Sequence, residues 1–298
     1  MQELRGQFDT LWAVSDIHGY RDELEQLLTG AGLAVRKTGS ARVTWTPGKA
    51  RQLLIVDGDL IDGGPDSWGT VLLLRDLVSQ ASAAGSRVIV VLGNHEVAYL
   101  ASSKSGSGGS EVDIFLRSLP VAAFVGTWLF AHAGYIDAKP DSSALAAYFT
   151  DLGRLYSNQR PAFYRALLAP RSLTMAHGWW KHRRHRSEMK ASLQRLGLSG
   201  VVFGHDPQAL FARGTLAMNR AGWLLKLDAG LKSGDSSGML LRCEVIDVTL
   251  APAWKWRVLA CRSAMASRAV ASWCSCRSAD PVSRFHSAAA TCPSSAIR

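Results

Sequence analysis

Residues 52–62 read Gln-Leu-Leu-Ile-Val-Asp-Gly-Asp-Leu-Ile-Asp, an apolar run that ends among three aspartates. A short, continuous apolar run of this kind is typical of a strand buried on both faces. Asp59 and Asp62 then follow the carboxyl end of that strand, which is where α/β proteins hold their ligands. A helical pattern over residues 68–83 and a second apolar run over 87–92 come next. The order strand, polar loop, helix, strand predicts an α/β fold.

Four more segments deliver metal-binding side chains from strand-like runs. In chain order they are Asp16-Ile17-His18-Gly19, Gly93-Asn94-His95-Glu96, His132-Ala133-Gly134 and Gly204-His205. Any one of them could arise by chance, and His132 alone could be a satisfied histidine of the core. With residues 58–62 they make five motifs in one order over nearly two hundred residues, for which chance is a poor explanation. We therefore expect them to form one site.

Carboxylate, imidazole and amide groups in this combination predict a site for two divalent cations about 3.5–4 Å apart, which hydrolyses phosphate esters. A short aspartate at the end of a rigid strand suits the position between the two ions, so Asp59 is the expected bridge. Asp16 and His18, two residues apart, point the same way in extended chain and would hold one ion. The second ion would be held by Asn94, His132 and His205. Mixed nitrogen and oxygen ligands favour manganese, with iron or zinc as alternatives, over magnesium or calcium.

His95 follows Asn94 directly, which places a further imidazole beside the metals without making it a ligand. Asp62, three residues after Asp59, could orient this imidazole and raise its pKa. The pair is expected to act as the general acid, with His95 donating a proton to the departing oxygen. Glu96 is expected to cap the helix that follows it.

The ordered set resembles the calcineurin-like metallophosphoesterase superfamily, and within it the phosphoprotein phosphatase branch with its bacterial Shewanella-like phosphatases. The similarity covers roughly residues 10–248 and extends beyond the ligands to residues 31–33, 45–48, 64–67, 202–208 and 227–230. The resemblance implies an α/β (α+β) fold of two packed mixed β-sheets flanked by helices. It also implies that the dimetal site lies at the edge of this sandwich.

One position departs from that branch in a way that matters for substrate binding. Gly63 stands where the branch carries an arginine that clamps the phosphate, and a guanidinium there would bind substrate and transition state in bidentate fashion. The branch's second clamp arginine follows a tryptophan, which points to Arg183 or Arg184 after Trp179-Trp180. The metal ligands are thus expected to be complete and the phosphate clamp to be altered.

Basic residues and cysteines are concentrated at the end of the chain. Residues 251–298 hold seven basic residues and one acid of a chain with net charge +10, and all five cysteines lie at or beyond Cys243. Because periodicity fades after Pro252, we expect a metallophosphoesterase domain over residues 1–250 and a disordered basic Ala/Ser/Arg/Cys-rich tail over 251–298. The nearly balanced body predicts no nucleic-acid partner. The sequence has no apolar run long enough for a membrane, and the absence of cysteine up to residue 242 is typical of the reducing cytoplasm.

The expected activity is hydrolysis of phosphomonoesters, with protein phosphoserine or phosphothreonine as substrate, by a metal-bound hydroxide and without a covalent phosphoenzyme. The expected partner is therefore a phosphorylated protein or a small phosphoester. Two alternatives stay open: a dinucleoside polyphosphate hydrolase with the same metals, and a non-catalytic binding protein. The latter would keep the fold and hold an acidic partner through residues 181–186 and the tail. The oligomeric state is not encoded in these patterns.

Overall fold

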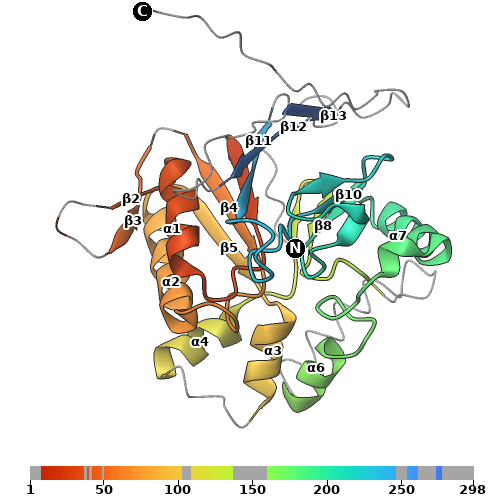
Figure 1. Cartoon of the computed structure of the whole chain (residues 1–298), viewed down its shortest axis with the longest axis horizontal. Helices are drawn as coiled ribbons and strands as arrows, with labels where there is room; N and C mark the ends of the chain where they lie inside the picture. Colours follow the sequence, from red (N-terminus) through yellow and green to blue (C-terminus); the bar gives the residue numbers. More distant parts are fainter. Residues whose placement is uncertain are drawn as a thin grey trace, which may run out of the picture.

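The computed structural model describes residues 8–36, 39, 42–48, 50–102, 109–136, 160–245, 254–260 and 273–276. Two mixed β-sheets lie next to each other, with helices outside them (Figure 1). Over these ranges, no helix combines the length and the hydrophobicity that are needed to cross a bilayer. The expected α/β fold with two packed mixed sheets is confirmed.

The larger sheet supplies three of the loops that carry predicted ligands. Its six strands lie in the order β13 (Trp273–Cys276), β12 (Trp254–Ala260), β11 (Met239–Val245), β1 (Thr10–Val14), β4 (Gln52–Asp57) and β5 (Arg87–Val91). Strands β1, β4 and β5 are parallel, whereas β11 is antiparallel to β1, β12 to β11 and β13 to β12. The register pairs Val14 with Val56 and Asp57 with Val91, so the three parallel strands end at one edge.

The smaller sheet supplies the remaining two loops. Its strands lie in the order β6 (Ala123–Val125), β7 (Trp128–Phe130), β8 (Gly200–Phe203), β10 (Leu224–Lys226) and β9 (Ala217–Met218). Strands β7, β8 and β10 are parallel, and β6 and β9 are antiparallel to their neighbours. A separate hairpin consists of β2 (Ala34–Arg36) and β3 (Val43–Trp45).

The helices cover the outer sides of the two sheets (Figure 1). On the side of the larger sheet lie α1 (Arg21–Gly30), α2 (Ser67–Ala83) and α4 (Ser110–Ser118); α3 (Asn94–Ala101) and α6 (Arg160–Leu167) lie below, and α7 (Arg183–Arg195) flanks the smaller sheet. Two short 3₁₀ turns are η1 (Trp179–Lys181) and η2 (Ala209–Phe211). Helix α2 begins where the side chain of Asp66 accepts a hydrogen bond from the N–H of Gly69 at 2.8 Å, a regular N-cap.

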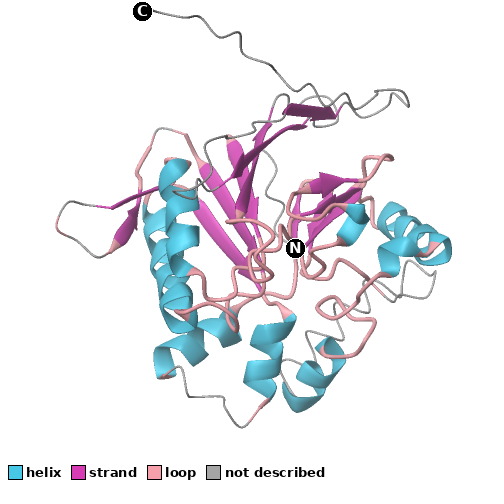
Figure 2. Ribbon diagram, viewed as in Figure 1, coloured by secondary structure: helices cyan, strands magenta, loops and turns pink. Residues whose placement is uncertain are grey.

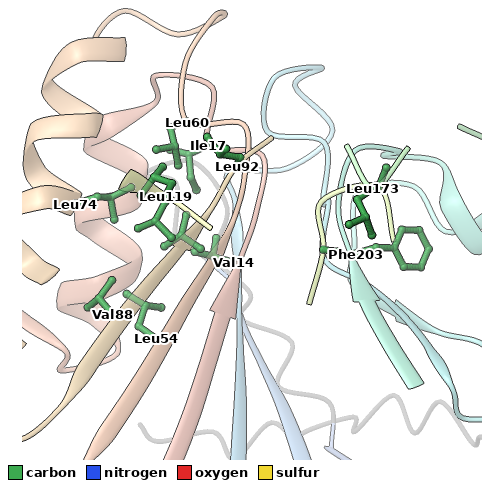
Figure 3. Packing of buried hydrophobic residues seen from close by; sticks show 14 of the residues in the cluster. Val14, Ile17, Leu54, Leu60, Leu74, Val88, Leu92, Leu119, Leu173 and Phe203 are labelled. Carbon is green, nitrogen blue, oxygen red and sulfur yellow. The ribbon is translucent and has the colours of Figure 1, made fainter. Parts of the chain in front are cut away.

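Strand β4 shows why its sequence is apolar throughout. Leu53 and Ile55 belong to the core between the two sheets, whereas Leu54 belongs to the core between the sheet and its helices. In Figure 3, Leu54 and Val88 lie on the side of the sheet that faces Leu74 of α2. Since successive side chains of a strand point to opposite faces, a strand buried on both faces needs an unbroken apolar run.

The tail contains more regular structure than expected. Strand β12 pairs with β11 and β13 pairs with β12, so both extend the larger sheet. The prediction of a disordered tail over residues 251–298 did not include these two strands. That prediction relied on composition, but residues 254–258 read Trp-Lys-Trp-Arg-Val, and such alternation is typical of a strand. The other residues of the tail lie outside the described ranges, and the domain boundary at residue 250 stays a prediction.

Candidate metal centre

Five loops meet where parallel strands of the two sheets end. Asp16 follows β1, Asp59 follows β4, and Asn94 begins α3 after β5; in the smaller sheet His132 follows β7 and His205 follows β8. Figure 2 shows loops gathered between the two sheets at this end. Residues up to 189 positions apart in the chain are brought into hydrogen-bonding contact here.

Asp59 lies at the centre of the cluster. Its Oδ2 is 3.6 Å from Nε2 of His18 and 3.8 Å from Nε2 of His95, and its Oδ1 is 3.2 Å from Nε2 of His132. Two groups of potential ligand atoms share this carboxylate, one with His18 and His95 and the other with His132 and His205, each group lying within 4.8 Å. Asp59 is therefore in the position that a bridging ligand requires. The bridging role itself stays a prediction.

Asp16 and His18 complete the side of the site nearest β1. The ring nitrogen Nδ1 of His18 lies 3.1 Å from the carbonyl oxygens of Ile61 and Asp62, so it donates there and leaves Nε2 facing the site. This Nε2 is 3.9 Å from Oδ1 of Asp16. The carboxylate of Asp16 also accepts the backbone N–H of His205 at 3.1 Å and thereby joins the two sheets.

The amide of Asn94 marks a point at which acceptor atoms converge. Its Oδ1 lies 3.0 Å from Nε2 of His132, 3.0 Å from Nδ1 of His205 and 3.2 Å from both carboxylate oxygens of Asp59. Nδ1 of His132 donates to the carbonyl of Asp57 at 2.8 Å, so its Nε2 faces the amide of Asn94 and the carboxylate of Asp59. A turned-over amide would direct its NH₂ group at these atoms, and a bound cation would hold the same atoms as ligands. The donor set therefore fits a metal ion.

The ligand loops hold their residues in uncommon backbone conformations. Seven non-glycine residues in the described ranges have positive φ, and five of them belong to the predicted site: Asp16 (57°), His18 (51°), Asp59 (54°), Asp62 (67°) and His205 (65°). Such conformations cost about 1–3 kcal/mol each and concentrate at functional sites. The fold therefore maintains strain at this cluster.

Glu96 holds two of the ligand loops together from inside the protein. One of its oxygens accepts the N–H groups of Gly93 and Asp59, both at 2.9 Å, and the other accepts those of Leu60 at 2.7 Å and Ile61 at 3.2 Å. The side chain is fully buried. Its bond to Gly93 caps α3 as expected, but the other three bonds fix the loop that carries Asp59. Helix capping alone does not reveal this second role.

Burial raises the pKa of several carboxyl groups in the cluster. Burial, together with the neighbouring Asp228, raises the pKa of Asp16 well above its usual range. Burial also raises the pKa of Asp57 to about 7 and that of Asp228 to about 6. Asp59 differs, because His132 lowers its pKa below the usual range against the effect of burial. Buried carboxylates are costly unless a cation compensates them, and a divalent ion would do so here.

His95 and Asp62 form a hydrogen-bonded pair beside the cluster. Nδ1 of His95 lies 2.9 Å from Oδ2 of Asp62, which leaves Nε2 facing Asp59 at 3.8 Å and the ammonium of Lys232 at 3.3 Å. The side chain of His95 is 25% exposed, so a substrate can reach it. Asp62 thus orients the imidazole, and the role of the pair as general acid stays a prediction.

Arg183 and Arg184 open α7, just after a segment that is anchored to the site. Nε1 of Trp180 donates to Oδ2 of Asp206 at 2.8 Å. Both arginines are exposed, and Nε of Arg184 lies 2.8 Å from a carboxylate oxygen of Glu188. Neither arginine contacts a predicted metal ligand within the described part of the chain. Their role in phosphate binding stays a prediction.

Two residues at the site, Asp228 and Lys232, were not among the expected site residues. Asp228 is buried and accepts the N–H of Gly230 at 2.8 Å. Lys232 lies four residues after Asp228, and its Nζ is 3.3 Å from Nε2 of His95. The stretch over residues 227–230 was part of the resemblance, but nothing in it indicated a role. His177, for which no spacing required a place at the site, has its ring 5.8 Å from that of His205.

Comparisons with known proteins agree with this geometry. A protein of Schizosaccharomyces pombe without an assigned function is 36% identical over 86 residues, which are 29% of this chain and 24% of that protein. The chain thus matches only about a quarter of that relative's length. The solved structure of a cold-active protein tyrosine phosphatase from a psychrophilic Shewanella species is similar with a TM-score of 0.62 and 20% identity, over 83% of this chain and 77% of that one. Another structure of a cold-active protein tyrosine phosphatase has a TM-score of 0.65 and 18% identity, over 85% and 76%.

At such low identity the solved structures show the fold alone. The family comparison goes further, because the calcineurin-like phosphoesterase family matches residues 10–209. This match covers more than half of the chain and contains all five ligand loops, from Asp16 to His205. The chain belongs to the calcineurin-like phosphoesterase family.

Proposed function

We propose that this protein is a dimetal-dependent phosphatase, with manganese as its ion, that hydrolyses phosphomonoesters. The observation that carries the proposal is the position of Asp59, which is shared by two groups of ligand atoms and lies 3.8 Å from the ring nitrogen of His95. Two cation sites beside a proton donor are what phosphate ester hydrolysis needs. Membership of the phosphoesterase family supports the same reaction class.

The side chains of the site have different roles in the proposed reaction. The cations would be held by Asp16, His18, Asp59, Asn94, His132 and His205, and when bound they supply an activated water and neutralise the phosphoryl oxygens. Asp62 accepts the Nδ1–H of His95, so the proton that leaves this ring comes from Nε2. The departing oxygen of the substrate takes that proton. Glu96 keeps the loop of Asp59 in place during the reaction.

For the substrate we propose phosphoserine or phosphothreonine in proteins, which the resemblance of the motifs to the phosphoprotein phosphatases supports. The similar solved structures carry the name of a protein tyrosine phosphatase, so phosphotyrosine is the first substrate to compare. Because Gly63 replaces the clamp arginine of the phosphoprotein phosphatases, the case for a protein substrate is weaker. A dinucleoside polyphosphate is therefore the second substrate to compare. The cysteine-free sequence up to residue 242 supports a cytoplasmic location.

The test is a phosphate-release assay with manganese on the wild type and two variants, Asp59→Asn and His95→Asn. We expect His95→Asn to lose about 10²–10⁴-fold in kcat, the range for a general acid. Asp59→Asn is expected to lose activity together with bound manganese, measured by elemental analysis. Glu188→Gln, on the exposed face of α7, is the control and is expected to match the wild type. Equal rates for all four proteins would exclude the proposal.

A panel of substrates then separates the finer possibilities. Phosphoserine, phosphothreonine and phosphotyrosine peptides, 4-nitrophenyl phosphate and diadenosine tetraphosphate are compared by kcat/KM with the same enzyme preparation. We expect the phosphoserine or phosphothreonine peptide to have the highest value. A preference for the dinucleotide or for phosphotyrosine would retain the reaction class and overturn the proposed substrate.

A further inference from the structure

Lys232 takes up the space next to Gly63 at the rim of the site. A Cβ atom at Gly63 would lie 3.3 Å from Cγ of Lys232 and 3.2 Å from Cβ of His18. Gly63 also has φ of 155°, a conformation that side chains rarely adopt. The aliphatic part of the lysine thus lies where a side chain of residue 63 would begin.

The loop that carries Lys232 is fixed by its own hydrogen bonds. The N–H of Gly234 donates to the carbonyl of Leu231 at 3.1 Å, and the N–H of Asp235 donates to that of Gly230 at 2.9 Å. Gly230 has φ of 75°, and a Cβ there would lie 2.7 Å from Cβ of Asp235, so the turn is closely packed. Lys232 is therefore presented from a defined turn.

The ammonium of Lys232 lies beside the proton donor. Its Nζ is 3.3 Å from Nε2 of His95, the nitrogen that faces the site. Across the described ranges, Lys232 has no ion pair with a carboxylate, and its side chain is exposed. The positive charge of Lys232 thus acts within the site and is available to an anion.

Nε2 of His95 and Nζ of Lys232 lie 3.3 Å apart, so one phosphate group can contact both. The bridging oxygen of a phosphomonoester can accept from His95 while a non-bridging oxygen accepts from Lys232. An ammonium is a point charge and binds one phosphoryl oxygen well, without the bidentate geometry of a guanidinium.

We propose that Lys232 binds the phosphate group of the substrate at the side of Gly63, next to the oxygen that His95 protonates. This inference rests on the proposed phosphatase function and adds a substrate-binding residue to it. Lys232 supplies a positive charge on the side where an arginine at position 63 is absent. The lysine takes no part in holding the cations.

The test compares Lys232→Met, Lys232→Arg and a charge-matched control, Lys190→Met, which removes an exposed lysine of α7. KM and kcat for 4-nitrophenyl phosphate and the inhibition constant of inorganic phosphate are measured with manganese. Lys232→Met is expected to raise KM and the inhibition constant about tenfold to hundredfold, the range for one charge-assisted hydrogen bond. Lys232→Arg is expected to recover most of this loss. Lys190→Met should behave like the wild type, and manganese content should be equal in all four proteins.

Values for Lys232→Met within twofold of the wild type, with activity intact, would overturn the lysine's role and leave the proposed function standing. A loss of bound manganese in Lys232→Met, or a failure of Lys232→Arg to recover binding, would also overturn it. If the wild type turns over no substrate, calorimetric titration with inorganic phosphate still tests whether Lys232 binds a phosphate group. Binding that Lys232→Met loses supports the lysine without the phosphatase, and equal binding or none in wild type and variant refutes it.

Discussion

Gly58→Ala is the substitution whose effect the structure defines most sharply. Gly58 precedes Asp59 and has φ of 83°. A Cβ here would lie 2.7 Å from both Cα and N of Gly93 and 2.8 Å from Nδ1 of His132. The first two atoms are backbone, and the ring of His132 is held by its hydrogen bond to the carbonyl of Asp57 at 2.8 Å. Because no neighbour is free to turn away, the ligand loops must move apart.

The expected cost has two parts. The left-handed conformation costs an alanine about 1–2 kcal/mol, and forcing an extra carbon into a packed site costs about 1–3 kcal/mol. The stiffer unfolded chain offsets about 0.4–1 kcal/mol of this. We expect a net loss of about 1–5 kcal/mol, a large part of a typical stability of about 5–15 kcal/mol. Gly85→Ala is the matched control, since Gly85 has φ of 69° and no atom within 4 Å of its Cβ position.

The assay is urea unfolding of both variants after removal of metal, followed by calorimetric titration with manganese. Gly58→Ala is expected to lose at least about 1 kcal/mol more than Gly85→Ala, because only the former adds a steric clash. It is also expected to bind manganese more weakly, since Asp59 and His132 move apart. Equal losses of stability in the two variants, with unchanged manganese affinity in Gly58→Ala, would refute the reasoning.

Three further predictions concern the charges of the site. Glu96→Gln replaces one acceptor oxygen by an NH₂ group that faces two backbone N–H groups. We expect this variant to bind manganese about 10–100-fold more weakly in calorimetry. The control Glu188→Gln is expected to bind manganese like the wild type. Neither carboxylate oxygen of Asp57 has a hydrogen-bond partner among the described residues, and its pKa of about 7 lies above the ordinary 3.8. Ionisation of Asp57 therefore destabilises the folded wild type progressively as the pH rises from about 4 to about 7. In metal-free urea unfolding, the free energy of unfolding of Asp57→Asn relative to the wild type should be at least about 1 kcal/mol higher at pH 8 than at pH 5. Because ligands must lose protons to bind metal, the rise in Tm on adding manganese should grow between pH 5.5 and 7.5; a constant or falling shift would contradict this.

The parts of the fold that were predictable depend on local patterns. The apolar run before Asp59 becomes β4 at Gln52–Asp57, and the helical spacing over residues 68–83 becomes α2 at Ser67–Ala83. A strand that is buried on both faces needs such a run, so it can be predicted from its own residues without knowledge of its neighbours. The predicted ligands follow the carboxyl ends of parallel strands, where α/β folds hold their ligands, and the order of the motifs predicted the five loops that carry them.

What could not be predicted depends on contacts between distant parts of the chain. Lys232 meets His95 across 137 residues, and no local pattern indicates that contact. The capping bond of Glu96 to Gly93 is local and was expected, whereas its bonds to the loop of Asp59 span 35–37 residues. Strand β12 was missed for a different reason, since its alternation is present in the sequence but the composition around it suggested disorder.

The division of the predicted ligands between the two sheets explains how a strained site rich in buried carboxyl groups is maintained. Asp16 and Asp59 leave the larger sheet, and His132 and His205 leave the smaller one, so neither sheet can form the site alone. The core between the sheets fixes their relative position, and this rigidity keeps the loops in left-handed conformations and the carboxylates close together despite their cost. A cation bound to this set would remove the repulsion and link the two sheets at once. Metal binding is therefore expected to stabilise the whole sandwich and not the loops alone.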